Sequence, residues 1–326
     1  MLDSDSLLRL LATGRFCSGS RLAAEHSVSR TTVAKSIRRL EKRYQIEVQK
    51  VPGRGYRLRH PLVLLDEDEI RRCLPNKGDG LLSRLEIHRI LDSTNGYLMN
   101  RSGRLNEAFD VVVAEQQTAG RGRNGRRWLS GFGSGIAMSI GMRVDCRMMA
   151  LSGLSLFVGL VVADALHGSG LVGCQLKWPN DLYWNDRKLG GILIELSGES
   201  EGPTSLVIGI GLNCYRGAYC ASIDQPATTL EEAGVDLDRN QLIASILRVL
   251  GERFPRFLEA GFVAFKDEWN ALSLLTDRKV EVMQGGSRFI GWFKGIDDGG
   301  AGLVQTQDGI RVLNGGEISL RKRVVY

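Results

Sequence analysis

The sequence lacks any C-x-x-C pair. Its six cysteines are scattered along the 326 residues, at positions 17, 73, 146, 174, 214 and 220. This spacing suits neither a zinc site nor a dense disulfide framework. We expect reduced thiols that mostly fill the core, as is usual in a cytoplasmic protein.

Targeting and membrane-spanning segments are also missing. The first residues, MLDSDSLL, lack the basic start of a signal peptide. The longest uncharged apolar run, around residues 150–163, ends at Asp164 and is too short to span a bilayer. We therefore predict a buried helix there, a cytoplasmic protein and no membrane partner.

Positive charge is concentrated in the first sixty residues. Residues 1–60 contain 13 Lys and Arg against 5 Asp and Glu, a net charge of +8. Residues 61–326 contain 30 and 32, a net charge of −2. This asymmetry indicates a polyanionic partner for the first sixty residues alone.

The basic segment has the pattern of a winged helix-turn-helix. We predict three helices, over residues 6–13, 19–26 and 29–43. The third has Ser29 as its N-cap and a single apolar stripe. Residues 46–58 then predict two short strands around a Pro-Gly-Arg-Gly turn.

The third helix would enter the major groove of DNA with its N-terminal end. We expect that end to present Ser29, Arg30, Thr31, Thr32 and Lys35. Arg54, at the tip of the hairpin, would lie along the phosphate backbone. A basic solvated face is the structural alternative. The capped helix, the hairpin and the confined charge together favour DNA binding.

The stretch GRGRNGRRW, residues 120–128, begins like the G-x-G-x-x-G fingerprint of dinucleotide-binding proteins. That fingerprint needs a helix after the glycines, whereas the residues after Trp128 predict a loop and then a strand. This excludes a Rossmann oxidoreductase. Four arginines among flexible glycines indicate instead a loop that binds an anion beside a flat ring. A mobile basic surface loop is the alternative.

Three other stretches combine polar residues with glycines or a cap. KWPNDLYWNDRKLGGILIEL, residues 177–196, places polar side chains between two strands. In IGIGLN, residues 208–213, alternating glycines leave one face of a strand bare. DSTN, residues 92–95, predicts an N-cap that opens a helix. Turn salt bridges, tight packing and a cap would explain each stretch singly, but not their joint occurrence.

Taken together, these stretches resemble the biotin protein ligases, and with the basic head their bifunctional ligase and repressor class. The stretches STN, GRGRNGRRW, KWPNDL, DRKLGGILIEL, IGIGLN and GGEISLR occur in this order in that family. The resemblance covers essentially the whole chain, although residues 214–228 match poorly. It implies an α/β multidomain fold: an N-terminal winged helix-turn-helix, a central mixed α/β catalytic domain (class II synthetase-like) and a C-terminal SH3-like small β-barrel.

The resemblance also implies a reaction and partners. Biotin and ATP would form biotinyl-5′-adenylate, with Mg²⁺ accompanying the ATP. The biotinyl group would then pass to a lysine of the biotin carboxyl carrier subunit of acetyl-CoA carboxylase. The adenylate would also act as a corepressor that promotes a homodimer on the operator DNA of the biotin operon.

The family's functional residues carry over to matching positions of this sequence. The implied biotin site consists of Ser93, Thr94, Asn95, Gln117, Gly120, Arg121, Gly122, Arg123, Lys188, Gly209 and Gly211. The implied nucleotide site consists of Arg126, Arg127, Trp128, Asn180, Asn213 and Arg321. Catalysis would depend on Lys188, Arg123 and Asp181, with Lys188 supplying positive charge at the reacting phosphate. No residue is implied as a metal ligand.

The C-terminal part of the sequence predicts a helix and then short strands. The helix begins at Asp238 and ends near Phe254, before Pro255. From Lys279 on, strands alternate with Gly-rich turns, which is typical of a small β-barrel. We place the domain limits at 1–61 for the winged helix-turn-helix, 66–274 for the catalytic domain and 275–326 for the C-terminal domain.

Two other functions share parts of this pattern. A DNA-binding regulator whose ligase fold only senses a ligand would not need Lys188, so that lysine favours an enzyme. A lipoate ligase would share the fold, but the KWPND and GRGRxG motifs favour biotin.

Overall fold

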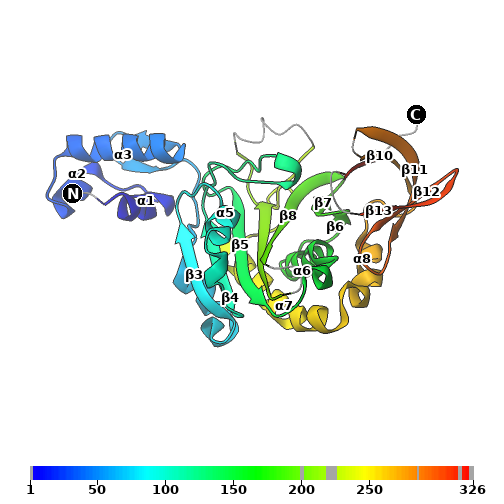
Figure 1. Ribbon diagram of the computed structural model, residues 1–326. Coiled ribbons are helices and arrows are strands. Elements are labelled where there is room, and N and C mark those ends of the chain that lie inside the picture. The colour runs from blue at the N-terminus through cyan, green and yellow to red at the C-terminus, as the bar shows by residue number, and fades with distance from the viewer. Residues whose placement is uncertain (1–2, 199–201, 218–225, 285, 315–317, 323–326) are drawn as a thin grey trace.

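The computed structural model describes residues 3–198, 202–217, 226–284 and 286–314, and the backbone of 318–322. Three parts follow one another in space, as Figure 1 shows. A small helical domain lies at one end, a large sheet with helices forms the middle, and a second sheet lies at the other end.

The N-terminal domain confirms the helices and the hairpin that the sequence predicts. It consists of α1 (Ser4–Ala12), α2 (Gly19–Glu25), α3 (Arg30–Tyr44), β1 (Val48–Val51) and β2 (Gly55–Leu58). Ser29 caps α3 by accepting a hydrogen bond from the backbone N–H of Thr32 at 3.1 Å. The apolar stripe of α3 is buried against α1 and α2 in a core of its own.

The central sheet has seven strands in the order β3-β4-β5-β9-β8-β7-β6. The strands are β3 (Leu82–His88), β4 (Phe109–Ala114), β5 (Gly135–Val144), β6 (Gln175–Lys177), β7 (Asp181–Trp184), β8 (Arg187–Gly198) and β9 (Thr204–Asn213). The pair β3–β4 is parallel, and the other neighbouring pairs are antiparallel. The expected mixed α/β sheet is therefore present.

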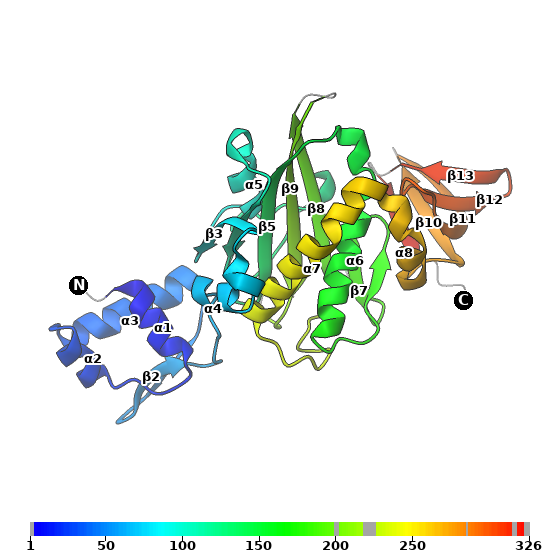
Figure 2. The same ribbon diagram turned by 90° about the horizontal axis from the view of Figure 1, so that it is seen from below.

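Helices pack on both faces of this sheet. They are α4 (Glu67–Arg72), α5 (Thr94–Met99), α6 (Leu154–Gly168), α7 (Arg239–Ala260) and α8 (Lys266–Leu272). The long helices α6 and α7 lie side by side on one face, as Figure 2 shows. Helix α5 lies on the other face, against β4, β5 and β9.

The two faces of β9 are built for different purposes. Ile208, Ile210 and Leu212 are buried on the face covered by α6 and α7. The alternate positions, Gly209 and Gly211, point to the face that carries α5. Because side chains alternate across a strand, one face of β9 builds the core while the other has room for a site.

Helix α6 confirms the buried apolar helix that the sequence predicts. By length and composition alone, residues Met148–Gly168 could cross a membrane, but 67% of the most apolar window is buried inside the fold. Phe157, Leu160 and Val161 have no exposed surface. The apolar run is therefore the central helix of the core.

Helix α7 does not end before Pro255, and the predicted end near Phe254 is wrong. The helix continues to Ala260 with the proline inside it. Phe254 and Phe257, on either side of the proline, have ring centres 6.1 Å apart, and Phe257 stacks on Phe157 of α6 at 4.8 Å. An interior proline costs about 3 kcal/mol, and burial of two aromatic side chains offsets a cost of that size.

The C-terminal sheet confirms the predicted short strands. They are β10 (Arg278–Gln284), β11 (Ser287–Ile296), β12 (Gly302–Thr306), β13 (Gly309–Leu313) and β14 (Ile318–Lys322), in the order β13-β12-β11-β10-β14. Buried Val280, Val282 and Phe293 join the core of the central domain. The described pairings leave β13 and β14 at opposite ends of the sheet, so closure into a barrel stays a prediction.

Candidate active site

The N-terminus of α5 forms one end of the site. Ser93 is its N-cap and accepts a hydrogen bond from the backbone N–H of Gly96 at 3.2 Å. Thr94 donates to Oε1 of Gln117 from both its backbone N–H, at 2.8 Å, and its hydroxyl, at 3.0 Å. Ser93 and Thr94 are buried. Three residues of the predicted biotin site therefore lie together.

A buried polar layer continues from Thr94 into the sheet. The hydroxyl of Ser139, on β5, lies 2.7 Å from the Thr94 hydroxyl and 2.5 Å from Oδ1 of Asn95. Asn95 packs on Gly209, where a Cβ atom would lie only 2.3 Å from the same Oδ1. Gly209 is therefore required by the neighbouring Asn95 side chain.

Glu195, on β8, connects α5 to the glycine–arginine loop, which we define as residues 120–128. Its Oε2 accepts one hydrogen bond from Nδ2 of Asn95, at 2.8 Å, and one from Nη2 of Arg121, at 2.9 Å. The same guanidinium passes over the first turn of α5, 3.7 Å from where a Cβ on Gly96 would be. One carboxylate thus holds a buried amide and the start of the loop.

The glycine–arginine loop folds back on itself instead of opening a helix. The backbone N–H of Trp128 donates to the carbonyl of Gly120 at 2.9 Å. The chain reverses at Asn124 and Gly125, whose φ angles of 56° and 70° lie in the left-handed region. A Cβ on Gly120 would lie 2.6 Å from the carbonyl oxygen of Trp128. The glycine therefore allows close approach of two chain segments, and the predicted absence of a following helix is confirmed.

The arginines of the loop lie in different surroundings. Nη1 of Arg123 lies 3.5 Å from Oδ1 of Asn180. Burial lowers the pKa of the Arg123 guanidinium, because a charged group is poorly solvated there. Arg126 and Arg127 are exposed to solvent. A poorly solvated cation flanked by exposed ones favours an anionic ligand such as a phosphate or a carboxylate.

Trp128 covers the second bare position of β9. A Cβ on Gly211 would lie 2.6 Å from Cε2 of the indole. Gly211 pairs with Gly191 of β8, so the indole lies over a part of the sheet without side chains. The ring that packs on Gly211 in this structure is therefore that of Trp128.

Lys188 and Asp181 form a largely buried ion pair. Nζ of Lys188 lies 2.5 Å from Oδ1 of Asp181, and their side chains are 16% and 18% exposed. Asp181 begins β7 and Lys188 lies near the start of β8, where the register between the two strands shifts. Two of the predicted catalytic residues are thus in direct contact.

The hairpin that carries this pair is not among the elements predicted from the sequence. Lys188 was expected between two strands, whereas it lies on β8 itself. The turn consists of Asn185 and Asp186, both with positive φ, 53° and 58°. Two turn-forming residues, Asn-Asp, between two short stretches that can form strands are a signal of a two-residue hairpin. The sequence therefore contains a signal for this hairpin.

The two asparagines predicted to bind nucleotide are hydrogen-bonded to the backbone. Nδ2 of Asn180 donates to the carbonyl of Ile192 at 2.7 Å, and Nδ2 of Asn213 to that of Thr228 at 3.2 Å. The first contact joins the chain before β7 to β8, and Nδ2 of Asn213 also lies 3.5 Å from the carbonyl of Lys188. The side chain of Arg321, the other predicted nucleotide contact, lies outside the described part of the chain. Residues 218–225 of the poorly matching stretch also lie outside it.

A cavity of about 350 Å³ lies between the central and C-terminal domains, next to the loop. Arg123 forms part of its wall, together with Pro179 and residues 192–194 of β8. Residues 299–301 of the C-terminal domain form another part. The C-terminal domain therefore borders the same space as Arg123.

The described residues contain no group of three or more His, Cys, Asp and Glu side chains that could hold a metal ion. Within the same part of the chain, five cysteines are free thiols, at positions 17, 73, 146, 174 and 214.

The surface predicted to bind DNA is accessible. Exposed residues at the N-terminal end of α3 are Ser29, Arg30, Thr31, Thr32 and Lys35. Arg54, in the turn between β1 and β2, is also exposed, with its guanidinium 4.4 Å from the centre of the Phe16 ring. Arg57 lies over the same ring at 4.5 Å.

Known proteins match the chain over almost its whole length. It is 40% identical over 317 residues to the bifunctional ligase/repressor BirA of Salmonella typhimurium, which covers 97% of each chain. It is 39% identical over 316 residues to the Escherichia coli protein of the same name, covering 97% of this chain and 96% of that one. The chain belongs to the biotin protein ligase family.

The match to this family extends over three segments. Residues 87–213 match the biotin/lipoate A/B protein ligase family, residues 4–57 match a helix-turn-helix domain, and residues 277–321 match the biotin protein ligase C-terminal domain. Among solved structures, the biotin protein ligase from Aquifex aeolicus in complex with biotin and ATP is 31% identical with a TM-score of 0.62. That match covers 74% of this chain and 100% of the other.

In this biotin ligase family member, two buried or half-buried polar residues of the site were not predicted from the sequence. Ser139 and Glu195 both lie within apolar strands, in GIAMSIGM and GGILIEL. A single polar residue in such a strand is a signal, because an unpaired polar group is costly to bury. The partner that each would find depends on the folded chain, which the sequence alone does not display.

Proposed function

We propose that the chain is an ATP-dependent biotin–protein ligase that also represses transcription. The observation that carries this is the alignment of three predicted groups on one face of the sheet. Asn95 and Trp128 cover successive bare positions of β9, and Nζ of Lys188 lies 3.6 Å from where a Cβ on Gly191 would be. Gly191 is the cross-strand partner of the glycine under Trp128. The groups that we assign to a ring, a nucleotide and a reacting carboxylate therefore lie next to one another on the sheet.

The biotin ring would bind at the end formed by α5. A ureido ring carries one strong acceptor and two donors, and an otherwise apolar pocket must meet them with placed polar groups. Ser93, Thr94 and Gln117 are such groups, held by the bonds described above. Asn95 would support them through Ser139. The backbone of the loop, at Gly120, Arg121 and Gly122, would cover the ring.

The first chemical step would form the acyl-adenylate. A carboxylate oxygen of biotin attacks the α-phosphorus of ATP, the bond from that phosphorus to the bridging β-phosphate oxygen breaks, and pyrophosphate leaves. Negative charge develops on the oxygens around the α-phosphorus, and the Lys188 ammonium would stabilise it. Arg123, Arg126 and Arg127 would hold the phosphates, and Trp128 would pack beside the adenine.

The second step would transfer the biotinyl group. The amine of the acceptor lysine attacks the biotinyl carbonyl carbon, the bond from that carbon to the phosphate oxygen breaks, and AMP leaves. The amine must lose a proton, and the carboxylate of Asp181, which contacts Lys188, would assist. No nucleophile on the protein is needed, because ATP has already activated the carboxylate. Catalysis would come from positioning and electrostatics.

Mg²⁺ would accompany ATP, and its chemistry would be to neutralise phosphate charge. The described residues do not offer a cluster of side chains that could bind a metal ion. The carboxylate described at the Lys188 end, that of Asp181, is paired with Lys188. The phosphates themselves would therefore hold the ion. Asn180, Asn213 and Arg321 complete the proposed nucleotide site.

For the repressor function, α3 would read operator DNA through its exposed N-terminal end, with Arg54 on the phosphate backbone. Biotinyl-5′-adenylate would promote a homodimer that places two such helices on the operator. The acceptor would be a biotin carboxyl carrier protein, in the cytoplasm. We also propose a class II synthetase-like central domain over 66–274, an SH3-like C-terminal barrel over 275–326 and a winged helix-turn-helix over 1–61.

The test is incorporation of labelled biotin into an isolated carrier domain, with ATP, Mg²⁺ and the full-length chain. We expect incorporation that depends on ATP and is not displaced by excess lipoate. Equal use of lipoate would indicate a lipoate ligase. Binding of biotin without adenylate formation would indicate a regulator that only senses its ligand.

A further inference from the structure

The DNA-binding domain and the central domain meet at a junction formed partly by the chain segments that lead to the α5 end of the site. The linker passes from one core to the other between adjacent residues, since Leu64 packs in the N-terminal core and Leu65 in the central core. Further contacts cross the junction. Nη1 of Arg9, in α1, lies 2.9 Å from Oδ2 of Asp66, and a second polar contact at Arg89 and an aromatic contact accompany this ion pair.

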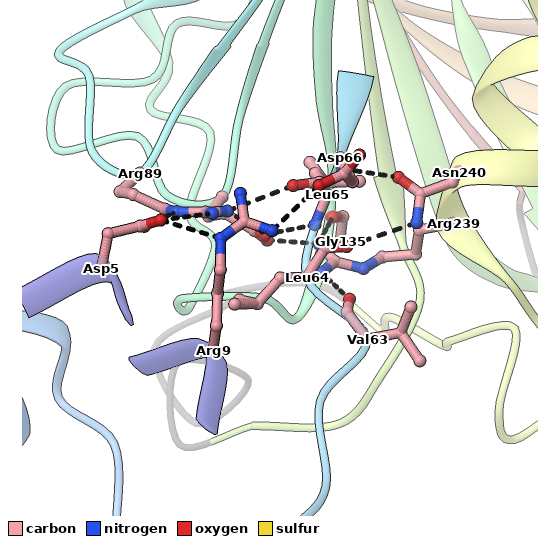
Figure 3. Close-up of polar contacts among 11 residues, drawn as sticks. Asp5, Arg9, Val63, Leu64, Leu65, Asp66, Arg89, Gly135, Arg239 and Asn240 are labelled. Carbon is pink, nitrogen blue, oxygen red and sulfur yellow. Dashed lines mark hydrogen bonds and ion pairs between the residues drawn. The ribbon is translucent and has the colours of Figure 1, made fainter. Parts of the chain in front are cut away.

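The second polar contact is centred on Arg89, which follows β3 (Figure 3). Its Nε donates to Oδ1 of Asp5 in α1 at 2.7 Å, and its Nη1 donates to the carbonyl of Leu65 at 3.2 Å. Nη1 also lies 3.4 Å from Oε1 of Glu115. Arg89 is 16% exposed and Glu115 is fully buried, so Asp5 is the outermost member of a chain of charges that leads inward. The hydrogen bond from Arg89 lowers the pKa of the Asp5 carboxyl.

Behind Arg89, Glu115 is anchored by a second arginine. Nη1 of Arg239 lies 2.7 Å from Oε2 of Glu115, and neither side chain is exposed. Arg239 also donates to the carbonyls of Val63, at 2.7 Å, and Gly135, at 3.0 Å. Oε1 of Glu115 also accepts a hydrogen bond from the backbone N–H of Leu65 at 2.7 Å, so contacts to both of its oxygens hold this carboxylate. The linker and the start of β5 are held by the same residue (Figure 3).

The aromatic contact comes from the recognition helix itself. Tyr44, the last residue of α3, lies with its ring centre 4.5 Å from that of Phe132. Phe132 follows the glycine–arginine loop, and Ile90, next to Arg89, packs against the same N-terminal core. The backbone N–H of Gly133 donates to the carbonyl of Glu115 at 3.0 Å. The polar and aromatic contacts are therefore joined within the central domain.

The chain segments that make these contacts also carry the proposed biotin residues. Arg89 and Ser93 lie on one segment, and Glu115 and Gln117 on the other. The two segments are bridged, since the backbone N–H of Leu91 donates to the carbonyl of Gln116 at 3.1 Å. One end of each segment thus faces the ligand site and the other faces the DNA-binding domain.

We propose that Arg89 and Phe132 are positioning residues that hold α3 at a fixed orientation on the central domain, so that operator binding depends on them while adenylate formation does not. This inference rests on the proposed repressor function. A dimer that reads two half-sites must present its two recognition helices at a set spacing. A domain that moves freely on its linker loses conformational freedom on binding DNA, and its affinity falls accordingly.

The variant Asp5→Asn separates positioning from simple electrostatics. It removes a negative charge from a basic domain, which by itself strengthens binding to DNA. If the contact with Arg89 holds the domain in place, its loss weakens binding to operator DNA instead. Glu25→Gln is the matched control: it removes the same charge from the same domain, and Glu25 is an exposed residue that pairs with Arg21 within α2 at 3.1 Å. Asp5→Glu keeps the carboxylate and tests for rescue.

Operator affinity is measured with the full-length chain saturated with biotinyl-adenylate. The probe is a DNA duplex selected from a random library by the wild-type chain in that state. We expect Asp5→Asn and Phe132→Ala to bind it at least about fivefold more weakly than wild type, which is ~1 kcal/mol. Glu25→Gln binds as well or better, and Asp5→Glu returns toward wild type. All variants form adenylate at the wild-type rate.

A distance measurement between spin labels on α2 and α7 gives the readout that a loss of folding would not mimic. We expect Asp5→Asn and Phe132→Ala to broaden the distance distribution while the helical content stays that of wild type. Unchanged operator affinity, or an unchanged distribution, overturns the inference. If the wild-type chain makes adenylate but selects no duplex, the repressor function fails instead.

Discussion

The two ends of the proposed ligand site are built in opposite ways. At the α5 end, Thr94, Asn95 and Ser139 are buried and hydrogen-bonded to one another. At the Lys188 end, Arg126 and Arg127 are exposed, and Lys188 is paired with Asp181. The groups proposed to bind the ring at the first end are neutral and hydrogen-bonded, with the Glu195 carboxylate as a charged neighbour, while the second end is a set of charges.

This difference fits the two halves of an acyl-adenylate. A neutral ring is recognised by groups held in place in advance, since buried polar atoms without partners are costly. A phosphate is recognised by cations, which a surface loop brings to it. The Lys188–Asp181 pair keeps a partly buried ammonium compensated, and a phosphate would take over that role. Specificity would therefore come from the α5 end and chemistry from the Lys188 end.

The largest expected effect is on the chemical step. Lys188→Ala removes the ammonium next to the reacting phosphate and leaves the Asp181 carboxylate uncompensated. We expect the single-turnover rate of adenylate formation to fall by about 10²- to 10³-fold. Lys294→Ala, which removes an exposed lysine of the C-terminal domain paired with Asp277, is the control and leaves the rate unchanged. A fall of less than about threefold in Lys188→Ala would remove this residue from the mechanism.

A smaller effect is expected at the α5 end. Thr94→Val deletes a hydroxyl that contacts both Gln117 and Ser139. Unsatisfied buried groups cost about 1–3 kcal/mol, which predicts biotin binding about 5- to 150-fold weaker. Calorimetric titration measures this affinity, and the Michaelis constant for ATP should stay unchanged. Thr118→Val is the matched control, because Thr118 is exposed and directly follows Gln117 in the chain.

The difference between the two ends is only partly visible in the sequence. Residue types at the Lys188 end are conspicuous, because four arginines in GRGRNGRRW and a lysine in DRKLGG stand out from their surroundings. The contacts at the α5 end were hidden, because Ser139 and Glu195 come from strands distant in sequence. The cap at Ser93 was predicted from local signals, whereas the continuation of α7 through Pro255 depends on tertiary packing against Phe157.

The link between the two ends predicts an intermediate effect. Glu195→Gln keeps an acceptor for Asn95 but loses the ion pair with Arg121, whose members are 24% and 46% exposed. Exposed pairs contribute up to about 1 kcal/mol, so we expect bound adenylate to dissociate about threefold to fivefold faster. In combination with Arg121→Met the two effects should not add, as a double-mutant cycle would reveal. Additive effects would mean that the pair does not hold the loop.

The smallest effect is expected from salt. Biotinol, an uncharged analogue with a hydroxyl in place of the carboxylate, would contact the α5 end alone. Its affinity should change by less than about twofold between ~0.05 M and ~0.5 M NaCl, whereas ATP affinity should fall several-fold, because exposed charges are screened. Equal salt dependence for the two ligands would contradict a division of the site into neutral and charged ends.

The most direct test compares two ligands on two proteins. Biotinol and a sulfamoyl analogue of biotinyl-adenylate are titrated into wild type and Lys188→Ala. We expect equal biotinol affinity in both proteins, within about twofold, and at least about 100-fold weaker binding of the adenylate analogue to the variant. A parallel loss for both ligands, or no loss for either, would contradict the division of the site into a ring-binding end and a charge-binding end.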